Sequence, residues 1–379
     1  MIKTMQKINK TMVSQIISGI LKFLVVAILV LVVIVIIIPS LLSIFKGNDI
    51  PPVDDSQLQL QIINIPEEEN AFYDLNKLYD TEKHQELISL KNIPKGKQLV
   101  SDYLESDQWD QEILAQLLTD NEDVLQYFTD AAAKGVFQLP EADRQSKISS
   151  DMPVTPLNNW REVSRLSGVK AIWLAKNGND KEALDEALKS IIIGTAIENS
   201  QGLLITHLVG IGIKDSGLDV LQKVISIIPK DSLILPEYKL KLENYQAKGN
   251  SAPFITEYLV SKQALDNLEQ GRNNPFGAVS KILMKNKFYF KRNLTMSYLF
   301  DFYDQLVIEA SKDCSEVKKV QNSVVPLEEN NLVKMYFTEN LVGKYYVEIP
   351  DLALNNVLEK KCTTEDKFKE TIQIISSIE

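Results

Sequence analysis

Residues 170–192 read KAIWLAKNGNDKEALDEALKSII, which joins the end of one amphipathic helix to the start of another. Gly178 stands where a helix ends in the left-handed conformation that glycine tolerates, and Asn179 followed by Glu182 has the spacing of a capping box. The second helix then carries one stripe of small and large apolar residues: Ala183, Leu184, Ala187, Leu188, Ile191 and Ile192. Such a stripe lets two helices approach closely, so the stretch predicts an antiparallel helical hairpin.

Helical periodicity recurs through most of the remaining chain, whereas sustained strand-like alternation is nearly absent. After a helix that begins at Pro66, helical periods are expected at about 97–105, 108–119, 121–134, 156–177, 180–200, 202–228, 236–247, 252–270, 294–312, 330–345 and 351–376. Polar residues 141–155 and residues 322–330 predict breaks between helices. We therefore predict an all-α fold, with one helical domain over residues 67–379 and a candidate subdivision near residue 272.

The hairpin resembles the tetratricopeptide repeat, a helix pair that turns at a glycine and packs through small residues. Within residues 165–229, a shift of 34 residues, the period of that family, places Gly178 and Leu184 on Gly212 and Leu218. The resemblance implies a stack of helical hairpins.

A second decisive stretch, FLVVAILVLVVIVIIIPSLLSIF at residues 23–45, contains no charged side chain. As a helix it would extend roughly 35 Å at ~1.5 Å per residue, slightly more than the hydrocarbon layer of a bilayer. The following LLSIFKGNDIPP lacks the small-residue pattern at which a secretory signal is cleaved. We therefore predict a retained transmembrane helix over residues 20–46, that is, a single-pass signal anchor.

The distribution of lysines sets the expected orientation of that helix. Lys3, Lys7, Lys10 and Lys22 precede its centre with no acidic residue among them, whereas acidic residues soon follow Lys46. Positive flanks stay in the cytoplasm. Residues 1–19 are therefore expected to be a cytoplasmic tail, residues 47–66 a linker or stalk, and the rest of the chain extracytoplasmic at the cell membrane.

Net charge argues against one class of partner. The chain carries a formal charge of −10, and the first 45 residues contribute four lysines and no acid, which leaves −14 for residues 46–379. An acidic domain repels phosphate backbones, so we expect no nucleic-acid binding. Lysine greatly outnumbers arginine and Asn and Ile are abundant, which suggests an AT-rich bacterial genome.

Four short motifs behind the apolar run carry a wider resemblance. PEEENAFYDL, GNDKEAL, KRNLTMSYLFDFYDQL and ENLVGKYYVEIPDL follow one another over most of the exported part. In this order they resemble uncharacterised, membrane-anchored helical proteins of bacteria. The resemblance implies the same layout and no particular activity.

Few side chains suited to metal binding are present. His84 and His207 are the only histidines, and their spacing with Cys314 and Cys362 matches no zinc-ligand pattern. His207 lies within an apolar helical period, which predicts a hydrogen-bonded histidine in the core. We expect neither a metal nor a cofactor.

Catalytic motifs are missing as well. The chain has no H-E-x-x-H, no G-x-S-x-G and no phosphate-binding loop, and close helix packing explains Gly210 and Gly212 better than a dinucleotide fingerprint does. Acidic pairs such as Asp107 with Asp110 are ordinary in so acidic a chain. We therefore predict no catalytic residue and favour a binding protein over an enzyme.

One basic segment interrupts the acidic background. SKILMKNKFYFKRN, residues 280–293, contains five cations and three adjacent aromatic residues: Lys281, Lys285, Lys287, Phe288, Tyr289, Phe290, Lys291 and Arg292. Aromatic rings among lysines suit a bilayer interface or a partner surface. The alternative is a solvated connector whose aromatic rings turn into the core.

Together these features favour a membrane-anchored helical binding or scaffold protein of the cell envelope, with a protein or peptide as its partner, because stacked hairpins expose extended surfaces. Two alternatives stay open. One is an envelope enzyme that uses scattered carboxylates, and the other is a small-molecule sensor domain.

Cys314 and Cys362 provide a direct test of the compartment, because exported thiols are free to oxidise. The two alternatives are a disulfide, worth roughly 4 kcal/mol for a loop of this length in the chain-entropy model, and two separate thiols. We expect mass spectrometry of unreduced peptides to recover the two cysteines linked. Alkylation of both in the folded protein would reject the bridge.

Overall fold

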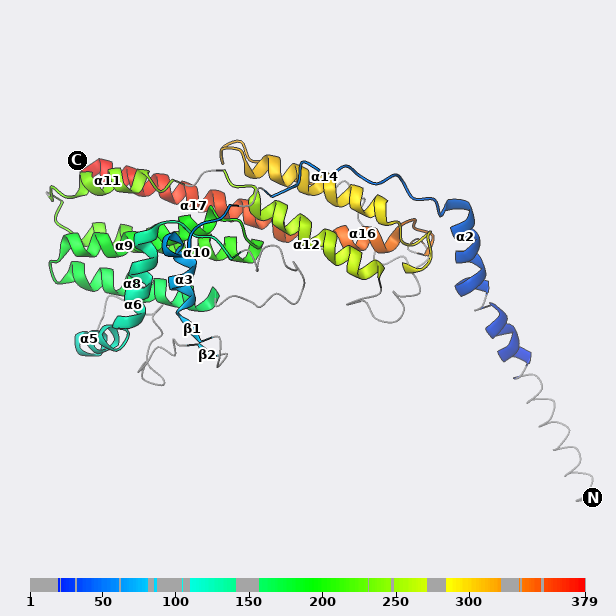
Figure 1. Cartoon of the computed structure of the whole chain (residues 1–379), viewed down its shortest axis with the longest axis horizontal. Helices are drawn as coiled ribbons and strands as arrows, with labels where there is room; N and C mark the ends of the chain where they lie inside the picture. The colour runs from blue at the N-terminus through cyan, green and yellow to red at the C-terminus, as the bar shows by residue number, and fades with distance from the viewer. Residues whose placement is uncertain are drawn as a thin grey trace, which may run out of the picture. The chain divides into compact units, whose positions relative to one another are not determined.

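In the part of the chain that the structure describes, all regular elements are helices apart from two strands of two residues each (Figure 1). The computed structural model describes residues 20, 22–30, 33–60, 63–80, 85–86, 104, 110–140, 157–230, 232–246, 249–270, 284–321, 334, 336–348 and 351–378. Strands β1 (Tyr79–Asp80) and β2 (Gln85–Glu86) pair antiparallel. The all-α prediction is confirmed.

Helices begin and end close to where periodicity places them. They are η1 (Val33–Ile37), α2 (Ile38–Lys46), η2 (Glu67–Glu69), α3 (Ala71–Asn76), α5 (Gln111–Asp120), α6 (Glu122–Lys134), α8 (Leu157–Lys176), α9 (Asp180–Glu198), α10 (Leu204–Ile227), α11 (Leu235–Glu243), α12 (Ala252–Glu269), α14 (Arg292–Ala310), α16 (Leu341–Glu348) and α17 (Asp351–Ile378). Of the period expected at 330–345, residues 330–333 and 335 lie outside the described residues, Lys334 and Tyr336 are helical, and Leu341 begins α16. The period expected at 97–105 lies outside the described residues except for Leu104. The breaks expected at 141–155 and 322–330 also lie outside them.

Around the apolar run, the described residues 20 and 22–30 are helical, and η1 continues directly into α2. Within the residues that the structure describes, no helix has both the length and the hydropathy that crossing a membrane requires.

The chain divides into two compact units, each built from separate segments. Unit 1 comprises residues 1–54, 265–299 and 323–349, and unit 2 comprises residues 55–264, 300–322 and 350–379. The subdivision expected near residue 272 lies outside the described residues. Each unit therefore assembles its core from parts far apart in the sequence.

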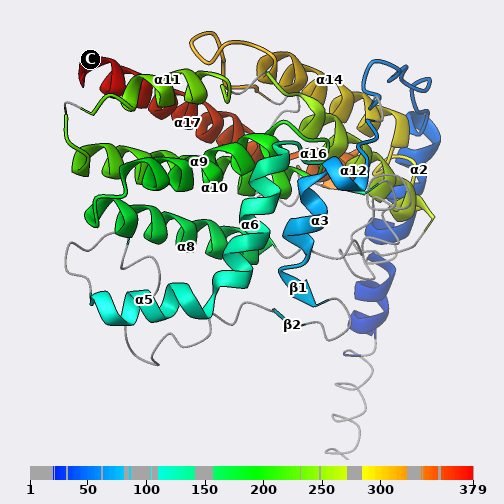
Figure 2. The ribbon, with the colours of Figure 1, turned by 60° about the vertical axis from the view of Figure 1, so that its left-hand side comes forward.

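The central feature of unit 2 is the stack of α8, α9 and α10 (Figure 2). Gly178 has φ +77° in the turn between α8 and α9, which confirms the predicted helix end. Asn179 occupies the N-cap position of α9, but its side chain makes no capping hydrogen bond. Gly212, which the 34-residue shift equates with Gly178, lies inside α10, so the two glycines have different environments.

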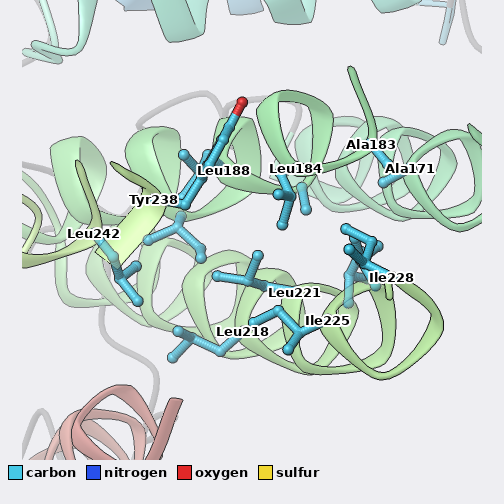
Figure 3. Close-up of a cluster of buried hydrophobic side chains, with 14 of the residues drawn as sticks. Ala171, Ala183, Leu184, Leu188, Leu218, Leu221, Ile225, Ile228, Tyr238 and Leu242 are labelled. Carbon is cyan, nitrogen blue, oxygen red and sulfur yellow. The ribbon is translucent and has the colours of Figure 1, made fainter. Parts of the chain in front are cut away.

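Apolar side chains from α9, α10 and α11 close the core beside this stack (Figure 3). Leu184 and Leu188 face Leu221 and Tyr238, all buried. Of the predicted stripe on α9, Ala183, Leu184, Ala187, Leu188 and Ile191 are buried and Ile192 is partly buried, as expected for the contact face of a hairpin.

Glycines set the separation of α9 and α10. A Cβ on Gly194 would lie 2.5 Å from the backbone nitrogen of Lys214, and one on Gly210 would lie 2.8 Å from that of Glu198. No side chain fits at either position. Close packing therefore explains Gly210, as predicted, but not Gly212, around which a Cβ would meet no atom within 4 Å.

Two further contacts fasten segments of unit 2 together. The first is a disulfide that joins Cys314 to Cys362 on α17, with the two Cα atoms 5.2 Å apart. A hollow of about 340 Å³ lies beside this disulfide. In the segment expected to be a linker, Leu58 is buried and Asp55 accepts hydrogen bonds from Tyr258 and Lys262 at 2.6 and 2.5 Å. Residues 55–58 thus belong to the folded unit rather than to a free stalk.

The two glycines of α10 offer a matched pair of substitutions. Gly210→Ala should lower the free energy of unfolding by about 1–3 kcal/mol, because the added methyl forces α9 and α10 apart. Gly212→Ala should leave stability unchanged or raise it by up to about 1 kcal/mol, because alanine favours the helix and has room. Urea unfolding of the full chain in mild detergent, followed by tryptophan fluorescence, measures both. Equal effects of the two substitutions would contradict the close approach.

Candidate functional site

The basic and aromatic segment does not present its rings to a membrane. Phe288, Tyr289 and Phe290 are all buried in unit 1, and the Tyr289 hydroxyl donates to the carbonyl oxygen of Tyr336 at 2.9 Å. The backbone amide of Asn340 donates to the Phe288 carbonyl at 2.8 Å, which ties the segment to the residues before α16. The interfacial role predicted for the three rings is therefore wrong, because they fill the core of the unit. The inward-facing alternative describes them.

Two cations of the segment are used for internal ion pairs. Lys291 is buried, and its Nζ atom donates to Glu339 and to the carbonyl oxygen of Asn48, the latter at 2.7 Å. Arg292 pairs with Asp266 at 2.5 Å and with Glu269 at 3.2 Å. Neither side chain is part of an open basic surface, which corrects that part of the predicted patch.

Lys285 and Lys287 behave differently, because both are exposed. They line a hollow of about 650 Å³ whose wall also includes Gly47, Asn48 and Asp49, the residues directly after α2. Lys281 lies outside the described residues. What remains of the predicted patch is thus a charged hollow, in whose wall Phe290 is the one ring of the three.

The position of the hollow follows from Gly47. A Cβ built on Gly47 would overlap the carbonyl oxygen of Ser43 and lie 3.2 Å from the Cβ atom of Lys287. The backbone that bears Lys287 therefore passes directly beside the end of α2. Only glycine leaves room for this approach.

Asp49 holds the chain in place at this point. Its carboxylate accepts hydrogen bonds from the amides of Asn293 and Leu294, at 2.7 and 3.0 Å, in the first turn of α14. A carboxylate at a helix N-terminus satisfies free amides and favours the helix dipole. The residues that follow α2, expected to start a linker, are instead fastened to the first turn of α14, which belongs to unit 1.

A second polar group lies deep in unit 2, where α9, α10 and α17 meet. Lys214 is fully buried, and its Nζ atom contacts Glu198 at 3.3 Å and also Glu365. The nearby Lys361 is buried as well and donates to the carbonyl oxygen of Ala310 at 2.8 Å. Two lysines thus face two glutamates, so the charges balance within the core.

Burial shifts the pKa of two members of this cluster and of a neighbouring histidine. Burial raises the pKa of Glu198 although Lys214 opposes the change, and burial lowers the pKa of Lys361. His207 is buried beside them, and desolvation lowers its pKa to about 4. Its Nδ1 atom lies 2.9 Å from the carbonyl oxygen of Glu198 and must be the donor, because a carbonyl only accepts. The prediction of a hydrogen-bonded core histidine is confirmed.

The chemistry of this cluster is structural. Its ionic groups neutralise one another and connect three helices, so we place no ligand among them. Within the described residues, no group of three or more His, Cys, Asp or Glu side chains is arranged to hold a metal ion. The hollow that follows α2 is therefore the better candidate for an interaction site.

Comparisons with protein-family models, with curated proteins and with solved structures find no match to the chain. The candidate site thus depends on geometry alone. Sequence reasoning located the basic segment, but the link from Asp49 to α14 and the pairing of Lys214 with Glu365 join residues more than a hundred positions apart. No local pattern indicates either.

His207 supplies a pH dependence that follows from its lowered pKa. Below an unfolded pKa of 6.5, the unfolded chain takes up a proton that the folded chain refuses until about pH 4, so stability falls as the pH drops through this window. Across this window the free energy of unfolding falls by about 3 kcal/mol through His207 alone. The raised pKa of Glu198 acts in the opposite direction.

The contribution of His207 is isolated by comparison with His207→Gln, in which the amide can still donate to the Glu198 carbonyl. Lys214, Lys361, Glu198 and Glu365 are the same in both proteins. Urea unfolding between pH 4 and 6.5 should show that the difference in the free energy of unfolding between the two proteins changes in favour of the variant as the pH falls. A constant difference would contradict the assignment of a neutral, buried imidazole.

Proposed function

We propose that the chain is a single-pass membrane protein whose helical part acts outside the cytoplasm as a binding or scaffold module for a protein or peptide. Residues 20–46 would form the span, with residues 1–19 in the cytoplasm. One observation carries the anchor: most of the large apolar side chains described in this segment are exposed, from Ile20 to Phe45.

The degree of this exposure is high. Phe23 is 73% exposed, Leu29 58%, Ile44 75% and Phe45 81%, so the folded part of the chain does not cover them. Water disfavours a contiguous apolar surface of this extent, and the interior of a bilayer favours it. We therefore assign the surroundings of this helix to lipid.

The way the chain leaves this segment supports a scaffold. Asp49 binds the first turn of α14, and Lys291 binds the carbonyl oxygen of Asn48. Folded structure therefore begins within a few residues of the anchor. A module held so near to the bilayer works at the membrane surface rather than at the end of a long tether.

The binding surface is supported by unit 2. Its helical hairpins present extended faces, and Leu233, just before α11, and Leu240, within α11, are 95% and 65% exposed. Exposed leucines beside a hairpin stack are suited to apolar side chains of a peptide or a protein partner.

The orientation is tested with a reporter that is active only outside the cytoplasm. Fusion after residue 60 should give activity and fusion before residue 15 should not. As a control, replacing Lys3, Lys7 and Lys10 with Gln should mix the two orientations, because the positive flank sets them. The reverse pattern in the unaltered chain would overturn the assigned compartment.

The binding role is tested in the same cells with a photoreactive residue. Placed at Leu233, it should give a discrete cross-linked species, and placed at the exposed Lys176 on the end of α8 it should not. Identical products at both positions would reject a specific partner surface around Leu233.

A further inference from the structure

We infer that the hollow beside the end of α2 binds the phosphate headgroup of an anionic membrane lipid, through Lys285 and Lys287. This inference rests on the proposed membrane anchor and specifies what the domain contacts at the bilayer. In place of the interface of exposed aromatic rings expected from the sequence, it assigns the contact with lipid to two lysines.

Placement is the first argument. The wall of the hollow starts at Gly47, the residue directly after α2, and Lys287 lies beside Gly47. Ile44 and Phe45, the exposed apolar residues assigned to lipid, precede Gly47 by no more than three positions. The hollow therefore lies at the depth where phosphate headgroups begin.

Charge is the second argument. Among the cations that line the hollow, Lys291 is paired with Glu339, and Arg292 with Asp266 and Glu269. The Asp49 carboxylate is occupied by the amides of α14. Within the described residues, Lys285 and Lys287 are thus the two lining cations for which the structure shows no carboxylate partner.

The volume of the hollow and the concentration of headgroups around it also favour a lipid ligand. About 650 Å³ accommodates a headgroup, since ligand pockets commonly measure roughly 300–1,000 Å³. An anchored chain keeps the two lysines in a layer of headgroups at very high local concentration. Basic residues near an anionic leaflet gain about 1 kcal/mol each, which for two lysines is enough to favour anionic over neutral lipid.

Native mass spectrometry of the full-length chain in non-ionic detergent provides the test, with phosphatidylglycerol as the anionic probe and phosphatidylcholine as the neutral one. Lys285→Gln combined with Lys287→Gln should weaken the retention of phosphatidylglycerol about 30-fold, since each lysine contributes roughly fivefold. Lys285→Gln alone should weaken it about fivefold, which covers the case of an unstable double variant.

The matched control is Lys181→Gln with Lys230→Gln, which removes the same charge from two exposed positions in unit 2 and should leave retention unchanged. Equal loss in the control, equal binding of phosphatidylcholine, or displacement of the lipid by an equal concentration of inorganic phosphate would each overturn the lipid site. Extraction of native membranes with alkaline carbonate distinguishes failure of the proposed anchor from failure of the lipid site. Release of the chain would overturn the anchor itself, whereas a retained chain with an unaltered lipid preference in the double variant would overturn only this inference.

Discussion

The structure of unit 2 depends on the short distance between α9 and α10. Gly194 and Gly210 allow backbone to lie against backbone, so the two helices approach closely at these positions without side chains between them. Any larger residue at these positions would separate the helices and open the apolar core beside them. The hairpin stack thus depends on the absence of side chains at Gly194 and Gly210 as much as on the leucines around them.

The short distance between α9 and α10 also explains why Lys214 is buried. The backbone of Lys214 packs against Gly194, which directs a lysine into the interior, where an isolated ammonium group would be very costly. Glu198 and Glu365 supply the compensating charges, the first from α9 and the second from α17. Removal of one member would leave the others uncompensated, so the cluster specifies how α17 meets the hairpin. His207 stays neutral beside them because burial opposes another positive charge.

Local signals predicted the helices well, because periodicity and a turn glycine act within a few residues. The ends of α8, α9 and α10 fall within two residues of their predicted positions, and Gly178 has the expected positive φ. Non-local features were missed. The contact of Asp49 with α14 turned an expected linker into part of a folded unit, and no composition rule identifies a helix cap supplied from 244 residues away.

The basic segment shows why a pattern of residue types does not define a surface. Lysines flank three adjacent aromatic residues in the sequence, but Phe288 and Tyr289 are buried in the core, while Lys285 and Lys287 remain in solvent. Lys291 is covered because Glu339 and the Asn48 carbonyl satisfy its ammonium group. The position of carboxylates elsewhere in the fold, rather than the sequence of the segment, therefore decides which cations remain available to an anion. Because those carboxylates are already paired, the two available lysines form a positive site in an otherwise acidic protein.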